Sequence, residues 1–306
     1  MAIVAQLVRA LDCGSRCRGF ETRRSPFFFD NGHIWYTELC NLRFSPMSLI
    51  EAFIFGLVQG LTEFFPVSSS AHLKLAKLFL GIQSSESLVL FDLVCHLGTL
   101  FALLYFLKRE IIQMFYQDRK RLLLLFIGTL PLIPCYFLLK PLRELASQLH
   151  FLGPCLILTA GILFLGHKLR FKKERPETIK GQMKDALWIG VMQSAALIPG
   201  ISRSASTICC AKILGWEAKE AVRFSFLLSI PTVVGGNCLE LLKISISQES
   251  LEGVPVSACA VGFLTSLLFG LLIVRFALSI LERGDLRPFA WYCLAFGTMI
   301  GLYFNL

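Results

Sequence analysis

The fold is decided by two matching stretches of the chain, FGLVQGLTEFFPVSSSAHLKLAKLFLG (residues 55–81) and IGVMQSAALIPGISRSASTICCAKILG (residues 189–215). The segments 91–99 and 224–232 continue the match at nearly the same offset. Similarity of this length at near-constant spacing predicts an internal duplication. The aligned identities pair Gly56 with Gly190, Gln59 with Gln193, Ser68 with Ser202, Ser70 with Ser204 and Gly81 with Gly215.

The chain as a whole is too apolar for a water-soluble domain. Of its 306 residues 55% are hydrophobic and 17% are charged, whereas soluble domains are about 45–50% apolar and about 25% charged. Apolar segments of the length that spans a bilayer recur along it, without the alternation of a membrane β-barrel. The sequence therefore predicts an all-α, polytopic integral membrane protein, with apolar segments at roughly 49–67, 88–107, 122–140, 151–167, 186–200, 224–242, 254–281 and 288–304.

Basic residues gather in segments 108–121 and 168–185 and in the turn that holds Arg283 and Arg287. Lys and Arg next to spans mark cytoplasmic loops, so all three segments are expected on one side of the membrane. Because the positive charge follows the ends of the spans, we exclude a nucleic-acid surface as its explanation.

The number of crossings between these basic segments gives the topology. Segment 186–215 must cross zero or two times, and Pro199-Gly200 splits it into two short pieces, which favours a re-entrant helical hairpin. The same interpretation of 49–80 leaves three full spans in each half. The prediction is six full spans and two re-entrant hairpins in two inverted repeats, an architecture whose site usually lies at the helix breaks.

Residues 1–46 differ from the rest of the chain, since they have no apolar core segment and no features of a secretory signal. The run VAQLVRA…GFETR resembles a conceptual translation of a transfer-RNA gene. We interpret 1–46 as an artefactual extension, with Met47 as the start of a single membrane domain, 47–306. Its repeats would cover about 47–167 and 183–306.

Each break contains proline, then a cluster of hydroxyl residues, then a resumed apolar helix. Serine is a preferred N-cap and proline fits a first helical turn, so each break offers backbone N–H groups that favour an anion. Arg203 adds a side chain that binds phosphate oxygens bidentately. We predict a phosphate or diphosphate site whose substrate-binding residues are Gln59, Ser68, Ser70, Gly200, Ser202, Ser204 and Thr207.

The first break also carries candidate catalytic groups. The serines of 68–70 are potential nucleophiles, and His72 can reach back within one helical turn as a general base or acid. Glu63 can transfer protons or bind a divalent cation, and Gln59 shares its helix face. Together with Arg203 these residue types suit phosphoryl transfer.

A structural role is the alternative for each group by itself. Serines in spans often hydrogen-bond backbone or pack helices, and a single intramembrane histidine is often a satisfied core residue. The presence of all these groups in two matched breaks favours a functional site, because polar residues at membrane depth are costly. His96, Thr99 and Thr232 are interpreted as structural or packing residues.

The motifs QGLTEFFPVSSSAH (59–72) and PGISRSAST (199–207) resemble the two signatures of the bacterial undecaprenyl-diphosphate phosphatases, the bacitracin-resistance protein family. The resemblance runs from about Met47 to the C-terminus. It implies a multi-pass enzyme of the bacterial plasma (inner) membrane that hydrolyses undecaprenyl diphosphate to undecaprenyl phosphate and phosphate. That reaction regenerates the lipid carrier for peptidoglycan and other envelope glycans and confers bacitracin resistance.

The resemblance also implies roles for single residues. Ser69, His72, Glu63 and Arg203 would be catalytic, and Glu63 with Gln59 would bind a divalent cation, Mg²⁺ or Ca²⁺. The site would face the periplasmic side. The chain departs from the family pattern at Gln59, where Glu is frequent, and at Ala71 and Ala205, where glycine is common.

A lipid-phosphate flippase or transporter is the alternative function, because inverted repeats with paired broken helices are also a transporter design. The serine and histidine favour an enzyme, since transport requires no nucleophile. The expected partners are a polyprenyl diphosphate lipid and membrane lipids, with no nucleic acid and with homo-oligomer formation left open.

Overall fold

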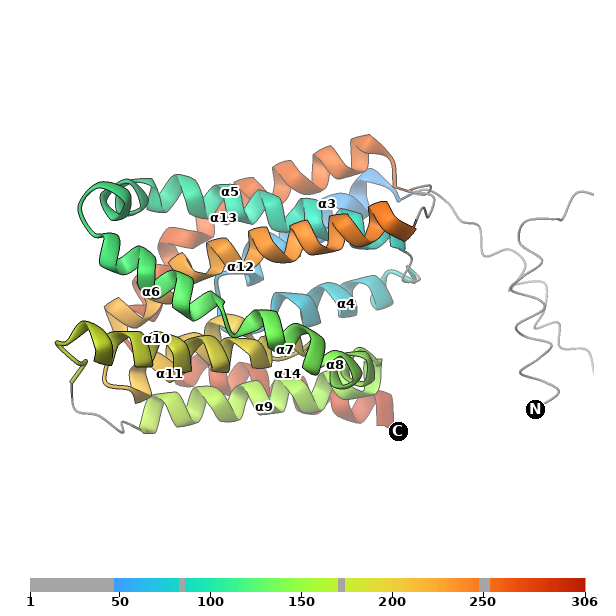
Figure 1. Cartoon of the computed structure of the whole chain (residues 1–306). Coiled ribbons are helices and arrows are strands. Elements are labelled where there is room, and N and C mark those ends of the chain that lie inside the picture. Colours follow the sequence, from blue (N-terminus) through green and yellow to red (C-terminus); the bar gives the residue numbers. More distant parts are fainter. Residues whose placement is uncertain (1–46, 83–85, 170–173, 248–253, 306) are drawn as a thin grey trace, which may run out of the picture. The chain divides into compact units, whose positions relative to one another are not determined.

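The computed structural model describes residues 47–82, 86–169, 174–247 and 254–305. The chain divides into two units, 1–44 and 45–306, and every described residue belongs to the second. The interpretation of 1–46 as an extension therefore lies outside the described residues. Within the described part every regular element is a helix, which confirms the all-α class (Figure 1).

The helices follow one another in the same order in the two halves of the chain: a broken pair, a long helix, a third helical segment and a final helix. In the first half these are α3 (Leu49–Thr62), α4 (Ser69–Phe79), α5 (Glu86–Tyr116), α6 (Arg119–Thr129), α7 (Leu132–Leu138), α8 (Lys140–Ala146) and α9 (Leu149–Lys168). In the second half they are α10 (Ile179–Ser194), the 3₁₀ turn η2 (Ala195–Leu197), α11 (Arg203–Ile213), α12 (Ala218–Ser247), α13 (Val256–Leu281) and α14 (Arg287–Asn305).

The two broken pairs are hairpins that enter from opposite ends of this unit. In Figure 1, α3 runs inward from the right and α4 returns to the right, whereas α10 enters from the left and α11 returns to the left. Both turns contain a residue with positive φ, Ser68 at 68° and Gly200 at 97°. The breaks expected from the sequence are therefore present, and they meet inside the helical unit.

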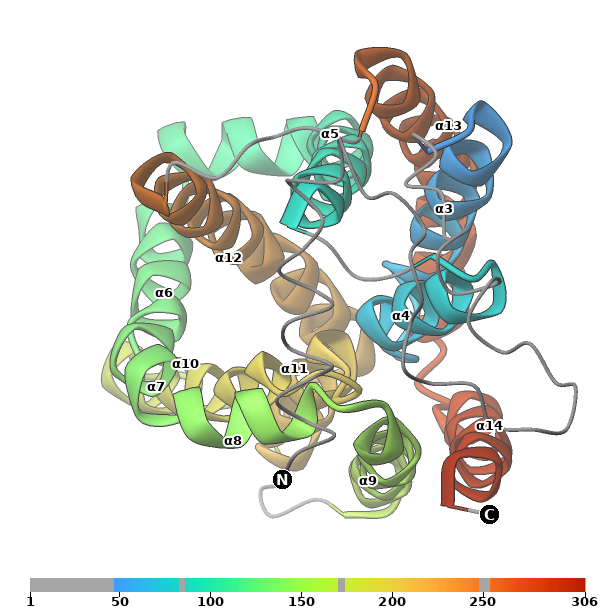
Figure 2. The same ribbon diagram turned by 90° about the vertical axis from the view of Figure 1, so that its right-hand side faces the viewer.

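Each hairpin packs its entering helix on the third segment of the other half, α3 on α13 and α10 on α6. Viewed end-on, α3 lies beside α13, and α9 lies beside α14 (Figure 2). Glycine permits the close crossings: a Cβ on Gly56 would lie 2.7 Å from the Gly262 carbonyl oxygen, and one on Gly190 would lie 2.3 Å from that of Gly128. Gly128 and Gly262 are separated by as many residues as Gly56 and Gly190, so the crossing is duplicated.

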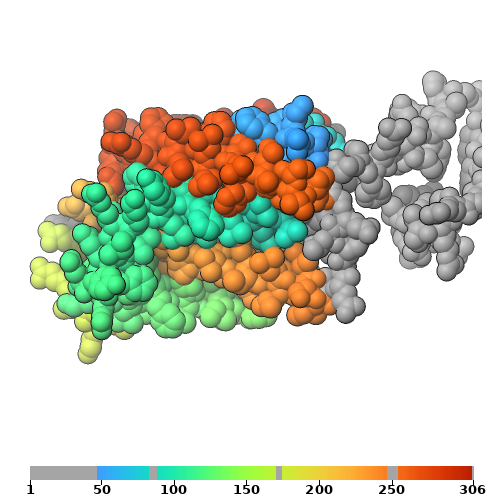
Figure 3. Space-filling model, turned by 90° about the horizontal axis from the view of Figure 1, so that it is seen from above, coloured from blue at the N-terminus to red at the C-terminus, as the bar shows by residue number. Residues whose placement is uncertain are grey.

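Five helices of the described residues are long and apolar enough to cross a membrane: Leu88–Tyr116, Arg119–Leu138, Leu149–Lys168, Ala218–Ile246 and Val256–Leu281. Helix α14 has 19 residues and is not among them, so a sixth full span stays a prediction. Large apolar side chains project outward from these helices, among them Leu264, Leu268 and Leu272 of α13. This helix lies beside α5 on the face shown in Figure 3, as expected of a surface in contact with lipid.

The basic segments meet at one end of the unit. Arg223, at the start of α12, forms ion pairs with Glu110 near the end of α5 and with Glu282 just after α13, at 2.6 and 2.8 Å. His167 and Asp285 approach to 3.6 Å between α9 and the α13–α14 turn. The loops after α5, α9 and α13 therefore lie at the same end, on the left in Figure 1.

We predict that Gly190→Ala destabilises the protein, because the new Cβ would meet the Gly128 backbone. Overpacking of this kind costs about 1–3 kcal/mol, and thermal unfolding of the purified protein in detergent measures it. Gly161→Ala on α9 is the matched control: its Cβ meets nothing within 4 Å, so the usual helix preference for alanine should leave stability unchanged or raised. Equal melting temperatures for both variants would contradict the close crossing.

Candidate active site

A cavity of about 690 Å³ lies where the two hairpin turns meet. Its polar wall comes from the α3–α4 turn, the α10–α11 turn and the long helices α5 and α12. Another part of the wall is apolar and contains Val89, Leu93, Leu132, Ile133, Phe137 and Leu239. The cavity thus combines a polar wall with an apolar wall that suits a hydrocarbon chain.

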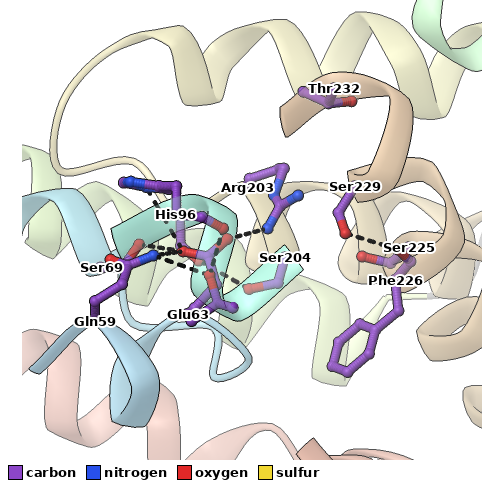
Figure 4. A network of polar contacts seen from close by, with 12 residues as sticks. Gln59, Glu63, Ser69, His96, Arg203, Ser204, Ser225, Phe226, Ser229 and Thr232 are labelled. Carbon is purple, nitrogen blue, oxygen red and sulfur yellow. Dashed lines mark hydrogen bonds and ion pairs between the residues drawn. The ribbon is translucent and has the colours of Figure 1, made fainter. Parts of the chain in front are cut away.

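Glu63 lies at the centre of the polar wall (Figure 4). Its side chain is only 9% exposed, and the carboxylate accepts three side-chain hydrogen bonds. Arg203 Nη2 donates to Oε1 at 2.6 Å, while Ser69 Oγ and Gln59 Nε2 donate to Oε2 at 2.7 and 3.0 Å. The carboxylate, the hydroxyl and the guanidinium predicted from the two breaks are therefore in direct contact.

The contacts join the starts of two helices from different halves. Ser69 is the first residue of α4 and Arg203 the first of α11, and the two stand at equivalent positions of the repeat. Ser204 Oγ also donates to the Phe65 carbonyl oxygen at 3.2 Å, which fastens the second turn to the first. The site is thus built by both halves, with a different residue type from each.

The polar environment of the hairpins is partly duplicated. Gln59 Nε2 donates to Thr99 Oγ1 at 3.4 Å in the first half, and Thr232 Oγ1 donates to Gln193 Oε1 at 3.3 Å in the second. In each half this bond ties the entering helix to the long one. Leu197 stands where the alignment would place a second Glu63, so the second half has no carboxylate at this position.

The other predicted substrate-binding residues divide into two groups. Ser68, Ser70 and Ser202 line the cavity, and the Ser68 and Ser70 hydroxyls lie 3.3 Å apart. Gly200 and Thr207 do not line it. A Cβ on Gly200 would lie 2.5 Å from Cys155 Cβ, and Thr207 Oγ1 is bonded to Ser225 Oγ at 2.6 Å, so both support the second turn from behind.

The structure does not bring His72 to the hydroxyl cluster. Its Nδ1 is bonded to the main-chain oxygen of Ser68 at 2.8 Å, and its Nε2 lies 2.7 Å from the Tyr292 hydroxyl of α14. The ring stacks on Tyr292 and Phe296. The expected contact between His72 and a nucleophilic serine is therefore not formed, because the ring is held against α14 instead.

His96, interpreted from the sequence as structural, lines the cavity instead. Its Nε2 lies 3.9 Å from Glu63 Oε2. Asp92 also lines the cavity, and its Oδ2 accepts a bond from Lys77 Nζ at 2.6 Å. The signal for this face was the spacing Asp92, His96, Thr99, which follows one side of a helix directly after the first break.

Several buried polar atoms at the site have no hydrogen-bond partner among the residues that the structure describes. They include Nη1 of Arg203 and Oε1 of Gln59. An unpaired buried donor or acceptor costs about 1–3 kcal/mol, so both atoms have capacity for a ligand. Within the described residues no group of three or more His, Cys, Asp and Glu side chains is arranged to hold a metal ion.

The arrangement can perform phosphoryl transfer. A hydroxyl bonded to a carboxylate is an activated nucleophile, and a guanidinium with a free donor beside two helix starts is an electrostatic site for phosphate oxygens. The apolar wall would accommodate a lipid chain attached to that phosphate.

Comparisons with known proteins agree with this chemistry. The family model described as bacitracin resistance protein BacA matches residues 52–299. The protein named undecaprenyl-diphosphatase from Protochlamydia amoebophila is 39% identical over 261 residues, 85% of this chain and 100% of the relative. The undecaprenyl-diphosphatase of Carboxydothermus hydrogenoformans is 40% identical over 261 residues, 83% of this chain and 97% of the relative.

Proposed function

The chain belongs to the bacitracin resistance protein BacA family and dephosphorylates undecaprenyl diphosphate, and from this we propose that the Glu63 network performs the hydrolysis. The observation that carries the proposal is the contact of Ser69 and Arg203, from opposite halves, with one buried carboxylate. The products are undecaprenyl phosphate, the lipid carrier for cell-wall synthesis, and inorganic phosphate.

In our proposal the diphosphate lies between the starts of α4 and α11. Arg203 donates hydrogen bonds from the unpartnered Nη1 to the diphosphate oxygens. The backbone N–H groups of both helix starts add partial positive charge. Ser68, Ser70 and Ser202 line the same space and offer further hydroxyl donors. The prenyl chain follows the apolar wall of the cavity.

Ser69 Oγ then attacks the terminal phosphorus. Its proton passes to Glu63, to which it is already bonded at 2.7 Å, while the bond from the terminal phosphorus to the bridging oxygen breaks. Glu63 gives that proton to the departing undecaprenyl phosphate. Substrate oxygens compete with Glu63 for Arg203, and this competition frees the carboxylate to accept the proton.

Water completes the reaction. Glu63, again ionised, accepts a proton from the water that attacks the phosphoserine, the phosphorus–Oγ bond breaks, and the proton returns to Ser69 Oγ. His72 acts in this scheme on the start of α4, through its bond to the Ser68 main chain, and not as the base that we expected from the sequence. Positioning of the first turn is the role that its contacts support.

A divalent cation, Mg²⁺ or Ca²⁺, is part of the proposal. The residues fit one: the Glu63 carboxylate and the unpartnered Gln59 Oε1 are oxygen donors, and Mg²⁺ usually takes one or two carboxylates together with substrate phosphates. When bound, the cation would neutralise charge that develops on the phosphoryl oxygens.

We further propose that the site opens on the periplasmic side of the inner membrane. The basic loops lie at one end of the unit, which the positive-inside rule makes cytoplasmic. The cavity is lined toward the other end by Tyr136 of α7, Arg143 of α8 and Glu240 of α12. These two observations support a periplasmic mouth.

Phosphate release from undecaprenyl diphosphate by purified protein tests the assignment of residues. Ser69→Ala and Arg203→Ala should each lower the rate about 10²–10³-fold or more, the loss seen when a donor to the transition state is removed. Thr298→Ala, an exposed hydroxyl bonded to its own helix, should leave the rate unchanged. A near-normal rate in folded Ser69→Ala protein would refute the nucleophile.

The cation is tested by chelation in the same assay. A chelator should abolish phosphate release and added Mg²⁺ should restore it. Gln59→Leu should raise the Mg²⁺ concentration for half-maximal rate about tenfold, because the variant loses the amide oxygen that we propose as a donor to the cation. Gln193→Leu, the equivalent change in the other half, should not alter it. Full activity in chelator would remove the cation from the mechanism.

A further inference from the structure

His96 lies in the active-site cavity without a role in the chemistry described above. Its side chain is 26% exposed and comes from α5, in the first half. The charged and titratable groups around it are Asp92 of the same helix, then Glu63, Tyr136, Arg143, Arg203 and Glu240, which line the same cavity from other parts of the chain, and Lys77, which pairs with Asp92.

The two ring nitrogens of His96 have different environments. Nδ1 lies 2.8 Å from the main-chain oxygen of Asp92, and only a protonated Nδ1 can donate to that carbonyl. The neutral ring then carries its lone pair on Nε2. A histidine that binds a metal commonly donates its other ring N–H to a backbone carbonyl in this way, which fixes the tautomer and the orientation of the ring.

Nε2 faces the carboxylate that we propose as the cation ligand. The distance from Nε2 to Glu63 Oε2 is 3.9 Å, too long for a hydrogen bond. Ligand atoms lie about 2.1 Å from Mg²⁺ or from Zn²⁺, so two atoms at this separation can both reach one ion that lies between them. The separation therefore leaves room for a shared cation and is too long for a direct bond.

We propose that His96 Nε2 is a ligand of the divalent cation at the active site, together with Glu63 and Gln59. The inference rests on the proposed cation and goes beyond it, since it adds a nitrogen donor from α5 to the oxygen donors of α3. It also predicts which ions bind well. An imidazole ligand favours ions such as Zn²⁺ over Ca²⁺, which prefers oxygen alone.

The test uses Mn²⁺ alone as the probe on the full-length protein in detergent, without substrate. Electron paramagnetic resonance measures Mn²⁺ affinity, and pulsed measurements on the same sample detect a histidine nitrogen bound to the ion. We expect nitrogen coupling in the wild type, its loss in His96→Gln, and Mn²⁺ affinity about tenfold lower or worse in that variant. His72→Gln, whose ring is bonded to Tyr292, should keep the coupling.

Labelling all histidines with ¹⁵N makes the test independent of how a variant folds. In the labelled wild-type protein, the coupling between Mn²⁺ and the histidine nitrogen should change from that of ¹⁴N to that of ¹⁵N. Absence of histidine-nitrogen coupling from the wild-type spectrum, or survival of that coupling in His96→Gln, would overturn the inference.

Variants of the oxygen ligands separate this inference from the proposed cation site. If Glu63→Gln and Gln59→Leu weaken Mn²⁺ binding but His96→Gln does not, only the histidine ligand is wrong. If none of the three weakens binding, the cation site itself is wrong.

Discussion

The ion pair between Glu63 and Arg203 is the interaction on which the rest of the site depends. Two charges inside an apolar helical unit are costly to desolvate, and they are tolerated here because each satisfies the other at 2.6 Å. The pair is possible only because the helix breaks of the two halves meet, so the inverted hairpins and the glycine crossings behind them serve one contact. The same contact holds Ser69 and the guanidinium where a phosphate can bind.

Duplication supplies the framework of this enzyme and divergence supplies its chemistry. The bonds between Gln59 and Thr99 and between Gln193 and Thr232 repeat one structural device. At the reactive positions the halves differ. In the alignment of the two repeats, Ser69 corresponds to Arg203 and Glu63 corresponds to Leu197. One hydroxyl, one carboxylate and one guanidinium therefore meet at a single site between the two hairpins.

Much of this could be predicted from the sequence, for reasons that can be traced. The repeat offset and the paired breaks predicted the hairpins, and the charges of Glu63 and Arg203 in an apolar background marked both as candidate site residues. Their ion pair was not predicted. The place of His72 could not be predicted, because it depends on Tyr292 of α14, far away in the chain. His96 was missed because its only signal, the spacing of Asp92, His96 and Thr99 along one side of a helix, is equally typical of a helix that packs on its neighbours.

A double-mutant cycle on the unfolding free energy in detergent tests the central claim, that Glu63 and Arg203 bind one another across the two halves. Glu63→Leu and Arg203→Leu should each cost about 3–5 kcal/mol, because each leaves a buried charge unpaired. The double variant should cost much less than their sum, whereas a double variant whose cost equals the sum would contradict the account.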